Sequence, residues 1–315
     1  MNQRVFTDPR CTEHRVPYGF PECPQRLESV LARMRRTWEV EEASPHAEGH
    51  DAILAVHESI YVEAFEQAVA RGDGLLGSAD NPLSSGTWNA ARGAVDATLC
   101  AVDWVMDAET DEAREAFVAA RPPGHHAERE LAMGFCFFNN IAVGAEYLIR
   151  MHGLERVAIL DFDVHHGNGT QHLFEARADI HYSSVHQWPF YPGTGDAGET
   201  GLGEGEGATF NVPLAAGAGD EEYLRVFEER LLPALAAFGP EALLLSAGFD
   251  AWSRDPVGGM RVSGAAFGRF GVLLREFAGH HCGGRMLSVL EGGYDLQALP
   301  GLVAGYLSGG EEKTA

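Results

Sequence analysis

The residues best suited to chemistry follow a short apolar run, 157–160, in the middle of the sequence. The stretch LDFDVHHGNGTQ begins at the last residue of that run and places Asp161, Asp163, His165 and His166 within six positions. In an extended chain, residues two apart project from the same face, so Asp161, Asp163 and His165 share one side and His166 points away. Carboxylates and imidazoles are ligands of Zn²⁺, but acids at a strand end can also cap a neighbouring helix. The stretch therefore indicates either a metal site or a hydrogen-bonded polar strand end.

Three further apolar runs also lead into chemically active residues. AFVAA precedes His125 and His126, ALLLS precedes Asp250, and MLSVL precedes Tyr294. Continuous apolar runs of this length are typical of strands that are buried on both faces. Ligands of parallel α/β sheets bind outside the carboxyl ends of the strands, so we expect the four runs to converge on one crevice. This convergence favours a metal site with catalysis over a patch of helix caps.

Asp163, His165 and Asp250 are the predicted metal ligands. The first two share one face of the chain, and Asp250 comes from a different strand end. Three protein ligands leave one position of a tetrahedral Zn²⁺ ion open for water or substrate. The same oxygen and nitrogen ligands would also accept Fe²⁺ or Co²⁺.

His125, His126 and Tyr294 are the predicted catalytic groups. A tandem histidine pair after Pro-Pro-Gly suits proton transfer, and Asp161 and Asn168 are candidates to orient the outer nitrogens and set different basicities. Tyr294 follows two glycines and can donate to an oxygen on which negative charge develops. With a metal that lowers the pKa of water, these groups predict hydrolysis of a carbonyl compound. The sequence has no G-x-S-x-G nucleophile motif, which disfavours an acyl-enzyme.

Segments with helical periodicity alternate with the apolar runs. This alternation predicts an α/β fold with a central, mainly parallel sheet and helices on both faces. No internal repeat or long linker divides the sequence, so we expect one domain over 1–315, with a surface loop at 193–207 and a flexible tail at 308–315. The expected helices are 24–37, 52–70, 85–106, 137–151, 221–237 and 264–278, and the expected strands are 116–120, 157–160, 242–246 and 286–290.

The composition excludes several classes of function. The chain has 46 acidic and 23 basic residues, a formal net charge of −23, which argues against binding to nucleic-acid phosphates. No apolar run reaches the roughly 18 residues of a membrane helix. The five cysteines contain no C-x-x-C pair, and no targeting segment precedes them. We therefore expect reduced thiols and a cytoplasmic location.

A series of motifs resembles the zinc-dependent histone deacetylase and acetylpolyamine amidohydrolase family. The motifs occur in the family's order, and together with PECPQR (21–26) they span residues 21–300. They are RPPGHHA (121–127), GFCFFNN (134–140), DFDVHHGNGTQ (161–171), YPGTG (191–195), SAGFDA (246–251) and EGGY (291–294).

The resemblance implies a three-layer, arginase-like α/β fold with an eight-stranded sheet. It carries Zn²⁺ ligation onto the three predicted ligands and catalysis onto the histidine pair and the tyrosine. It implies a structural K⁺ ion held by Asp161, Ser184 and the main-chain carbonyls of Asp163, His165 and Val185. It also implies an acyl-lysine tunnel with Arg26 near its floor, and the expected tunnel residues are Asp80, Phe135, Tyr191, Val257, Gly292 and Gly293.

Four positions refine the resemblance. Asn168 stands where class I members have Asp, so the chain resembles class II. Val257 stands where a polyamine-selective member carries a glutamate gatekeeper, which weakens a polyamine hypothesis. Phe20 replaces a frequent histidine, and Tyr191 replaces a frequent phenylalanine of the tunnel.

The sequence therefore predicts a zinc-dependent amidohydrolase that removes acetyl or another short acyl group from acyl-lysine in a protein or peptide. The first alternative is an acetylpolyamine or other small-molecule N-acyl amine deacylase. An arginase-type ureohydrolase would resemble a two-manganese site with more Asp ligands. A metal-stabilised binding module is the non-enzymatic alternative, although binding alone needs neither the histidine pair nor Tyr294. We expect no direct nucleic-acid or membrane partner, and a homo-oligomer is compatible with the sequence.

Overall fold

The structure, a computed structural model, describes residues 2–107 and 113–310, and this part of the chain contains one eight-stranded sheet. All strand pairings are parallel, and the order across the sheet is β2-β1-β3-β8-β7-β4-β5-β6. The strands are β1 (Asn2–Thr7), β2 (Val40–Glu42), β3 (Arg114–Val118), β4 (Val157–Asp161), β5 (Ile180–Gln187), β6 (Thr209–Leu214), β7 (Ala242–Ala247) and β8 (Arg285–Leu290).

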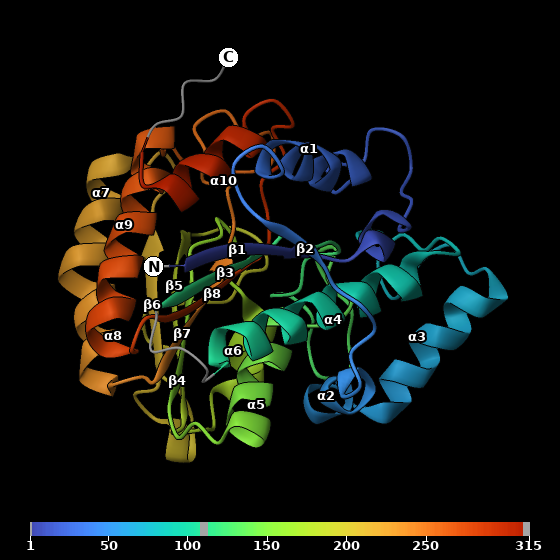
Figure 1. The fold of residues 1–315 in the computed structure, drawn as a ribbon, viewed down its shortest axis with the longest axis horizontal. Helices are drawn as coiled ribbons and strands as arrows, with labels where there is room; N and C mark the ends of the chain where they lie inside the picture. Colours follow the sequence, from blue (N-terminus) through green and yellow to red (C-terminus); the bar gives the residue numbers. More distant parts are fainter. Residues whose placement is uncertain (1, 108–112, 311–315) are drawn as a thin grey trace.

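Helices cover both faces of this sheet. The α-helices of the described residues are α1 (Pro24–Met34), α2 (Gly49–Val56), α3 (Ser59–Arg71), α4 (Thr87–Met106), α5 (Asn140–His152), α6 (Asn168–Phe174), α7 (Asp220–Val226), α8 (Leu232–Phe238), α9 (Gly264–His281) and α10 (Leu299–Ser308). In Figure 1, α7, α8 and α9 stand on one side of the sheet, and α4 and α5 on the other. This is the predicted three-layer α/β arrangement. None of these helices combines the length and the apolar character that a bilayer span requires.

The four strands that lead into the predicted site residues are neighbours at the centre of the sheet, in the order β3-β8-β7-β4. Every residue of β3, β4 and β7 is buried, as expected for apolar strands between two layers of helices. Because the strands are parallel, their carboxyl ends lie at one edge of the sheet. The topology therefore places all four sets of site residues together.

The expected helix 52–70 is instead two helices, α2 and α3, separated by His57 and Glu58 in extended conformation. The imidazole of His57 is buried. Its Nε2 accepts from the Asn139 N–H, and its Nδ1 donates to the Glu128 carbonyl, both at 2.9 Å. These tertiary bonds hold the backbone out of the helix that its periodicity predicts.

The other expected elements occur with shifted ends, and some elements were not expected. The expected helix 221–237 is α7 and α8 with a π-helical turn, Phe227–Leu231, between them. Pro233 follows that turn and has no N–H for a helical hydrogen bond. The residue pattern does not predict β1, β2, β5, β6, α6 or α10.

The segment 193–207 is packed against the molecule at its base. Gly195 and Gly205 are buried, and the Glu199 carboxylate accepts from the Gly195 N–H at 3.0 Å and from Gln171 Nε2 at 2.7 Å. In the segment 308–315, Ser308 ends α10, and residues 311–315 of the expected tail lie outside the described residues.

Candidate active site

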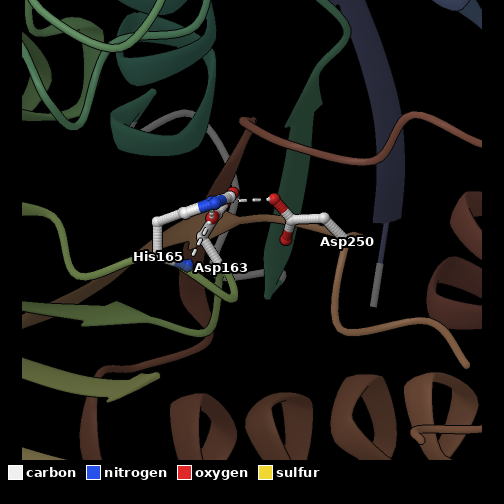
Figure 2. Close-up of side chains that lie close together, drawn as sticks. All are labelled: Asp163, His165 and Asp250. Carbon is white, nitrogen blue, oxygen red and sulfur yellow. Dashed lines mark hydrogen bonds and ion pairs between the residues drawn. The ribbon is translucent and has the colours of Figure 1, made fainter. Parts of the chain in front are cut away.

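Asp163, His165 and Asp250 lie close together beyond the carboxyl ends of β4 and β7 (Figure 2). Each offers one ligand atom, and these atoms lie within 4.8 Å of one another. His165 Nδ1 is 3.1 Å from Asp163 Oδ1 and 3.2 Å from Asp250 Oδ2. The structure thus brings together the three residues that the sequence predicts as metal ligands.

These three residues fit a divalent metal ion. All are buried, and Asp250 Oδ2 accepts no well-aligned hydrogen bond from the described residues, although His165 Nδ1 lies 3.2 Å away. The other carboxylate oxygens are fixed by the backbone, since the Val164 N–H donates to Asp250 Oδ1 at 2.9 Å and the Gly292 N–H donates to Asp163 Oδ2 at 2.8 Å. Two neighbouring buried carboxylates are costly without a compensating cation. A divalent ion with oxygen and nitrogen ligands would provide it.

The electrostatics of the three residues also favour a cation. Burial and the charge on Asp163 raise the pKa of Asp250 to about 7. Burial would raise the pKa of Asp163 as well, but His125 and His165 hold that pKa far below its usual range. Burial lowers the pKa of His165, but the two carboxylates outweigh it and raise the pKa to about 9. The raised pKa values of Asp250 and His165 both mean that the two carboxylates favour an added positive charge at this position.

Two glycines allow the backbone to pass directly beside the ligands. A Cβ on Gly292 would lie 2.1 Å from Asp250 Oδ2, and a Cβ on Gly248 would lie 2.1 Å from Asp163 Oδ2. Only glycine permits so close an approach. Gly292 is a predicted site residue, whereas the sequence reasoning did not single out Gly248.

His125 and His126 lie side by side after β3, with ring centroids 4.0 Å apart. His125 Nδ1 is 3.0 Å from Asp161 Oδ2, and His126 Nδ1 is 2.7 Å from Asn168 Oδ1. The backbone forms a turn at this pair, and the Ala127 N–H closes it by donating to the Gly124 carbonyl at 2.9 Å. The turn lets two adjacent residues face one site, and each imidazole has its own kind of partner.

The different partners give the two histidines different proton affinities. Burial would lower the pKa of His125, but Asp161 and Asp163 raise it to about 10. Burial, together with the positive charges of His125 and His165, lowers the pKa of His126 well below its usual value. Near pH 7, His125 is therefore protonated on both ring nitrogens and positively charged, whereas His126 is neutral and can act as a base.

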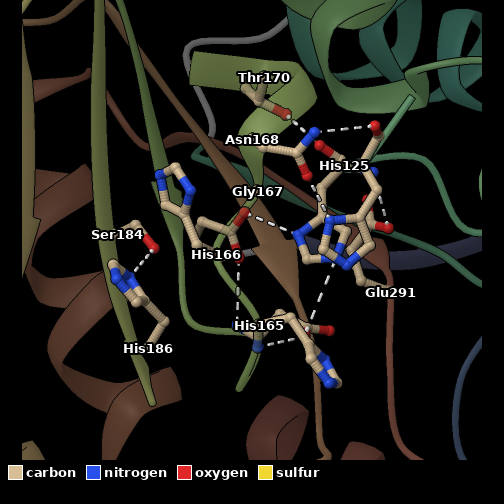
Figure 3. A network of polar contacts seen from close by, with 12 residues as sticks. His125, His165, His166, Gly167, Asn168, Thr170, Ser184, His186 and Glu291 are labelled. Carbon is tan, nitrogen blue, oxygen red and sulfur yellow. Dashed lines mark hydrogen bonds and ion pairs between the residues drawn. The ribbon is translucent and has the colours of Figure 1, made fainter. Parts of the chain in front are cut away.

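Two buried acids support the turn that carries the histidine pair. Glu291 accepts from the N–H groups of Gly124 at 2.7 Å and His125 at 3.2 Å (Figure 3). Glu22 accepts two bonds from the Arg121 guanidinium, at 2.9 and 2.7 Å. Both acids lie in motifs that carried the family resemblance, but the sequence reasoning gave neither a role.

Tyr294 is supported from below by Arg26. The Arg26 Cζ atom lies 4.7 Å from the centroid of the Tyr294 ring. Arg26 also donates to the carbonyls of Glu291 at 2.5 Å and Gly293 at 2.6 Å, and pairs with Glu22 at 3.2 Å. Burial raises the pKa of Tyr294 well above its usual value, so its hydroxyl keeps its proton.

A cavity of about 410 Å³ gives access to the histidine pair, His165 and Tyr294. Of the expected tunnel residues, Gly293 does not line it, because its carbonyl is turned towards Arg26. Asp80, Phe135, Tyr191, Val257 and Gly292 do line it, and so do Phe20, Pro21, Ala79, Pro123, Gly134 and Phe190. Phe190 was missed, although it precedes Tyr191 in the sequence; its ring stacks on His165 at 5.1 Å.

Gly134 and Phe135 form a strained turn in the cavity wall. Phe135 has a φ of 70°, which is rare for a residue with a side chain, and Gly134 has a φ of 55°. The Phe135 N–H donates to Asn81 Oδ1 at 3.0 Å. A Cβ on Gly134 would lie 2.4 Å from a ring carbon of His126. Strained backbone of this kind is concentrated at functional sites.

Three residues of the expected potassium site, Asp161, Ser184 and Val185, lie on neighbouring strands of the sheet, and Asp163 and His165 follow the end of β4. Asp161 in β4 and Ser184 in β5 are register partners, and Val185 follows in the same strand. Asp161 Oδ1 accepts from the Asp163 N–H at 3.1 Å, and Ser184 Oγ lies 2.9 Å from His186 Nδ1. The K⁺ ion stays a prediction.

The His166 side chain points away from His125 (Figure 3), as its position in the extended chain predicts. Its Nδ1 lies 2.8 Å from Thr194 Oγ1, and its Nε2 lies 2.9 Å from Gln171 Oε1. Its ring centroid is 4.9 Å from that of His186. His166 therefore links the start of the segment 193–207, at Thr194, to Gln171 of α6.

The site has the layout of an α/β amidohydrolase, because an apolar cavity ends at three buried residues that could hold a metal ion, beside groups that can transfer protons. The sequence-family model described as 'Histone deacetylase domain' matches residues 20–309 of this chain. The chain belongs to this metal-dependent family and is a deacetylase or amidohydrolase. A binding module without turnover is therefore not supported.

Relatives within the family are similar over most of this chain. The histone deacetylase-like amidohydrolase of Pseudomonas aeruginosa is 39% identical over 281 residues, which cover 89% of this chain and 73% of the relative. The polyamine deacetylase HDAC10 of Homo sapiens is 36% identical over 307 residues, which cover 91% of this chain and 45% of that protein. The crystal structure of an acetylpolyamine aminohydrolase from Burkholderia pseudomallei is 30% identical, with a TM-score of 0.88 and 98% of each chain covered.

Proposed function

We propose that this amidohydrolase uses Zn²⁺ to remove acetyl or another short acyl group from acyl-lysine in a protein or peptide. The observation that carries the proposal is the cavity above the metal ligands, whose walls include Phe135, Phe190 and Val257. An apolar passage suits the four-carbon stem of lysine, and the polar groups that could act on an amide lie at its inner end. Three protein ligands with one open position are typical of catalytic zinc.

The residues divide the hydrolysis between them. A divalent ion held by the three ligands supplies Lewis acidity that polarises the acyl carbonyl and lowers the pKa of water. His126, neutral near pH 7, accepts a proton from the attacking water and passes it to the leaving amine. His125, kept protonated by Asp161, places a positive charge beside the developing negative charge. Tyr294 donates a hydrogen bond to the oxyanion.

A deacylase of small acylated amines is the second candidate. Two relatives favour it by name, since one is called a polyamine deacetylase and the other an acetylpolyamine aminohydrolase. Against it, Asp80 is the sole carboxylate among the described residues that line the cavity. Val257 offers no negative charge to a second amine along the substrate. We therefore place acyl-lysine first.

The two candidates are separated by comparing acetyl-lysine peptides with N-acetylputrescine, N-acetylcadaverine and N-acetylspermidine on the zinc-loaded protein. We expect kcat/KM to be about tenfold or more higher for the peptides, because a second charged amine meets only one carboxylate, Asp80, among the described residues of this cavity. Asp250→Asn, purified in parallel, controls for contaminating hydrolases. The reverse ranking would assign the enzyme to small amines, and no turnover of either class by metal-replete protein would reject both.

A further inference from the structure

Asn168, which holds the outer nitrogen of His126, is itself held by Glu128, a residue to which the sequence reasoning gave no role. Asn168 Nδ2 donates to Glu128 Oε1 at 2.5 Å, while its Oδ1 lies 2.7 Å from His126 Nδ1. The amide thus bridges a carboxylate on one side and an imidazole on the other. Asn168 is buried, with 2% of its surface exposed.

The Glu128 carboxylate, the nearest acceptor to Nδ2, decides which way the amide faces, and the His126 carbonyl, 3.4 Å from the same nitrogen, favours the same orientation. An amide turned by 180° would place its oxygen against Glu128 Oε1, where two acceptors would repel each other. With Nδ2 towards Glu128, the oxygen must face His126, and the contact with His126 Nδ1 is then a bond donated by the imidazole. A neutral His126 in this tautomer has its Nε2 unprotonated. That nitrogen is the one that can accept a proton in the cavity.

Glu128 is fixed on both its side chain and its backbone. His172 Nδ1 lies 2.8 Å from the same Oε1 atom, and Asn168 and His172 are four residues apart on α6, so both project from one face of that helix. The Glu128 N–H donates to the Leu131 carbonyl at 2.9 Å, and the Glu128 carbonyl accepts from His57 Nδ1 at 2.9 Å. The side chain is only partly buried and does not line the cavity.

We infer that Glu128 is a positioning residue for the proton transfer: it orients the Asn168 amide and thereby keeps His126 in the tautomer that can act as a base. The inference rests on the function proposed above. It requires no contact between Glu128 and the substrate, so it predicts an effect on kcat and little effect on KM. In a serine protease, an amide that imposes the wrong histidine tautomer lowers kcat about 10⁴-fold, so even partial loss of orientation should be measurable.

The first test compares Glu128→Ala and Glu128→Gln on an acetyl-lysine peptide. Glu128→Ala should lower kcat about tenfold or more and leave KM within about twofold. In Glu128→Gln the side-chain carbonyl can still accept from Asn168, so most of the kcat should return. Glu130→Ala is the matched control, because Glu130 is an exposed acid of the same turn and should leave kcat unchanged. Parent kcat in Glu128→Ala would overturn the inference.

The second test asks whether the effect passes through Asn168. Asn168→Asp has no amide to orient and sets a second carboxylate against Glu128, so it should lower kcat. Adding Glu128→Gln to this variant should raise kcat, whereas the same change in the parent should not. A Glu128→Gln effect of equal size and sign in both backgrounds would refute a role through Asn168, because independent sites are additive.

A third readout does not depend on turnover. Nitrogen-15 NMR of labelled histidines distinguishes Nδ1–H from Nε2–H imidazole, and His126→Gln assigns the signal. The parent should show the Nδ1–H form of His126, and Glu128→Ala should show the Nε2–H form in addition. An Nδ1–H signal that is unchanged in Glu128→Ala would overturn the inference. A protein inactive on every acyl amide but showing the tautomer change would reject the proposed function and retain the role of Glu128.

Discussion

Replacing Tyr294 with Phe isolates one hydroxyl group from the rest of the site. The ring packs on Arg26 at 4.7 Å and on Phe135 at 6.0 Å, and both contacts survive the change. Tyr294 lines the cavity, and within the described part of the chain its hydroxyl has no hydrogen-bond partner to be left unpaired. Loss of one donor to a developing oxyanion lowers kcat by about 10²–10³, or about 2.7–4 kcal/mol. We expect that loss in kcat, and a KM within about threefold of the parent.

Steady-state kinetics on zinc-loaded protein measures this effect, with metal content and thermal unfolding determined on the same samples. Tyr191→Phe is the matched control, because it removes a hydroxyl at the cavity entrance, 3.4 Å from Asp80. It should leave kcat within about threefold. Parent kcat in Tyr294→Phe would show that the hydroxyl does not stabilise the transition state. Equal losses in the two variants would show that the effect is not specific to the inner end of the cavity.

Three further predictions concern charge, metal and backbone. Glu22 is buried between two arginines, so Glu22→Gln should lower the free energy of unfolding by about 3–5 kcal/mol at pH 7 in urea titrations. Burial opposes ionisation of Glu22, but the arginines lower its pKa to about 2. The stability that ionised Glu22 contributes is therefore complete above about pH 4.5 and is lost as the pH falls towards 2. The free energies of unfolding of variant and parent should converge at that low pH. Asp250→Asn should reduce zinc per chain, measured by plasma mass spectrometry, and abolish turnover, and unchanged zinc would contradict the assignment of this ligand. Gly134→Ala pushes a Cβ against His126 and should lower kcat about 10- to 100-fold, whereas Gly153→Ala, at a φ of 70° with no atom within 4 Å, should cost about 1–2 kcal/mol of stability and keep the parent kcat.

The centre of the fold is predictable from the sequence because its strands are continuous apolar runs. β5 is not, although each of its residues is buried. Its polar side chains are satisfied within the strand, where His181 Nε2 lies 2.7 Å from Ser183 Oγ and Ser184 Oγ lies 2.9 Å from His186 Nδ1. A pattern of hydrophobicity cannot reveal such pairing, because it scores each polar residue as exposed.

The site is predictable where its residues stand at strand ends, which is how Asp163, His165 and Asp250 were found. The groups that hold those residues in place are not, because they meet only in the folded chain. Glu22 is 99 residues from its partner Arg121. The amide of Asn168 is oriented by a carboxylate 40 residues before it. Helical and strand periodicity relates only residues that are a few positions apart, so it cannot reveal contacts between residues this far apart in the sequence.

The strand order has a consequence for how the enzyme comes into being. β3 is the third strand in the sequence. In the sheet it pairs with β1 on one side and with β8, the last strand to be synthesised, on the other. Until β8 leaves the ribosome, β3 has an open edge, which can pair with other chains. The histidine pair then also lacks both Glu291 and Tyr294. The site is therefore incomplete until residue 294 has emerged, and the pairing of β3 with β8, which are far apart in the sequence, is of the long-range kind that forms slowly.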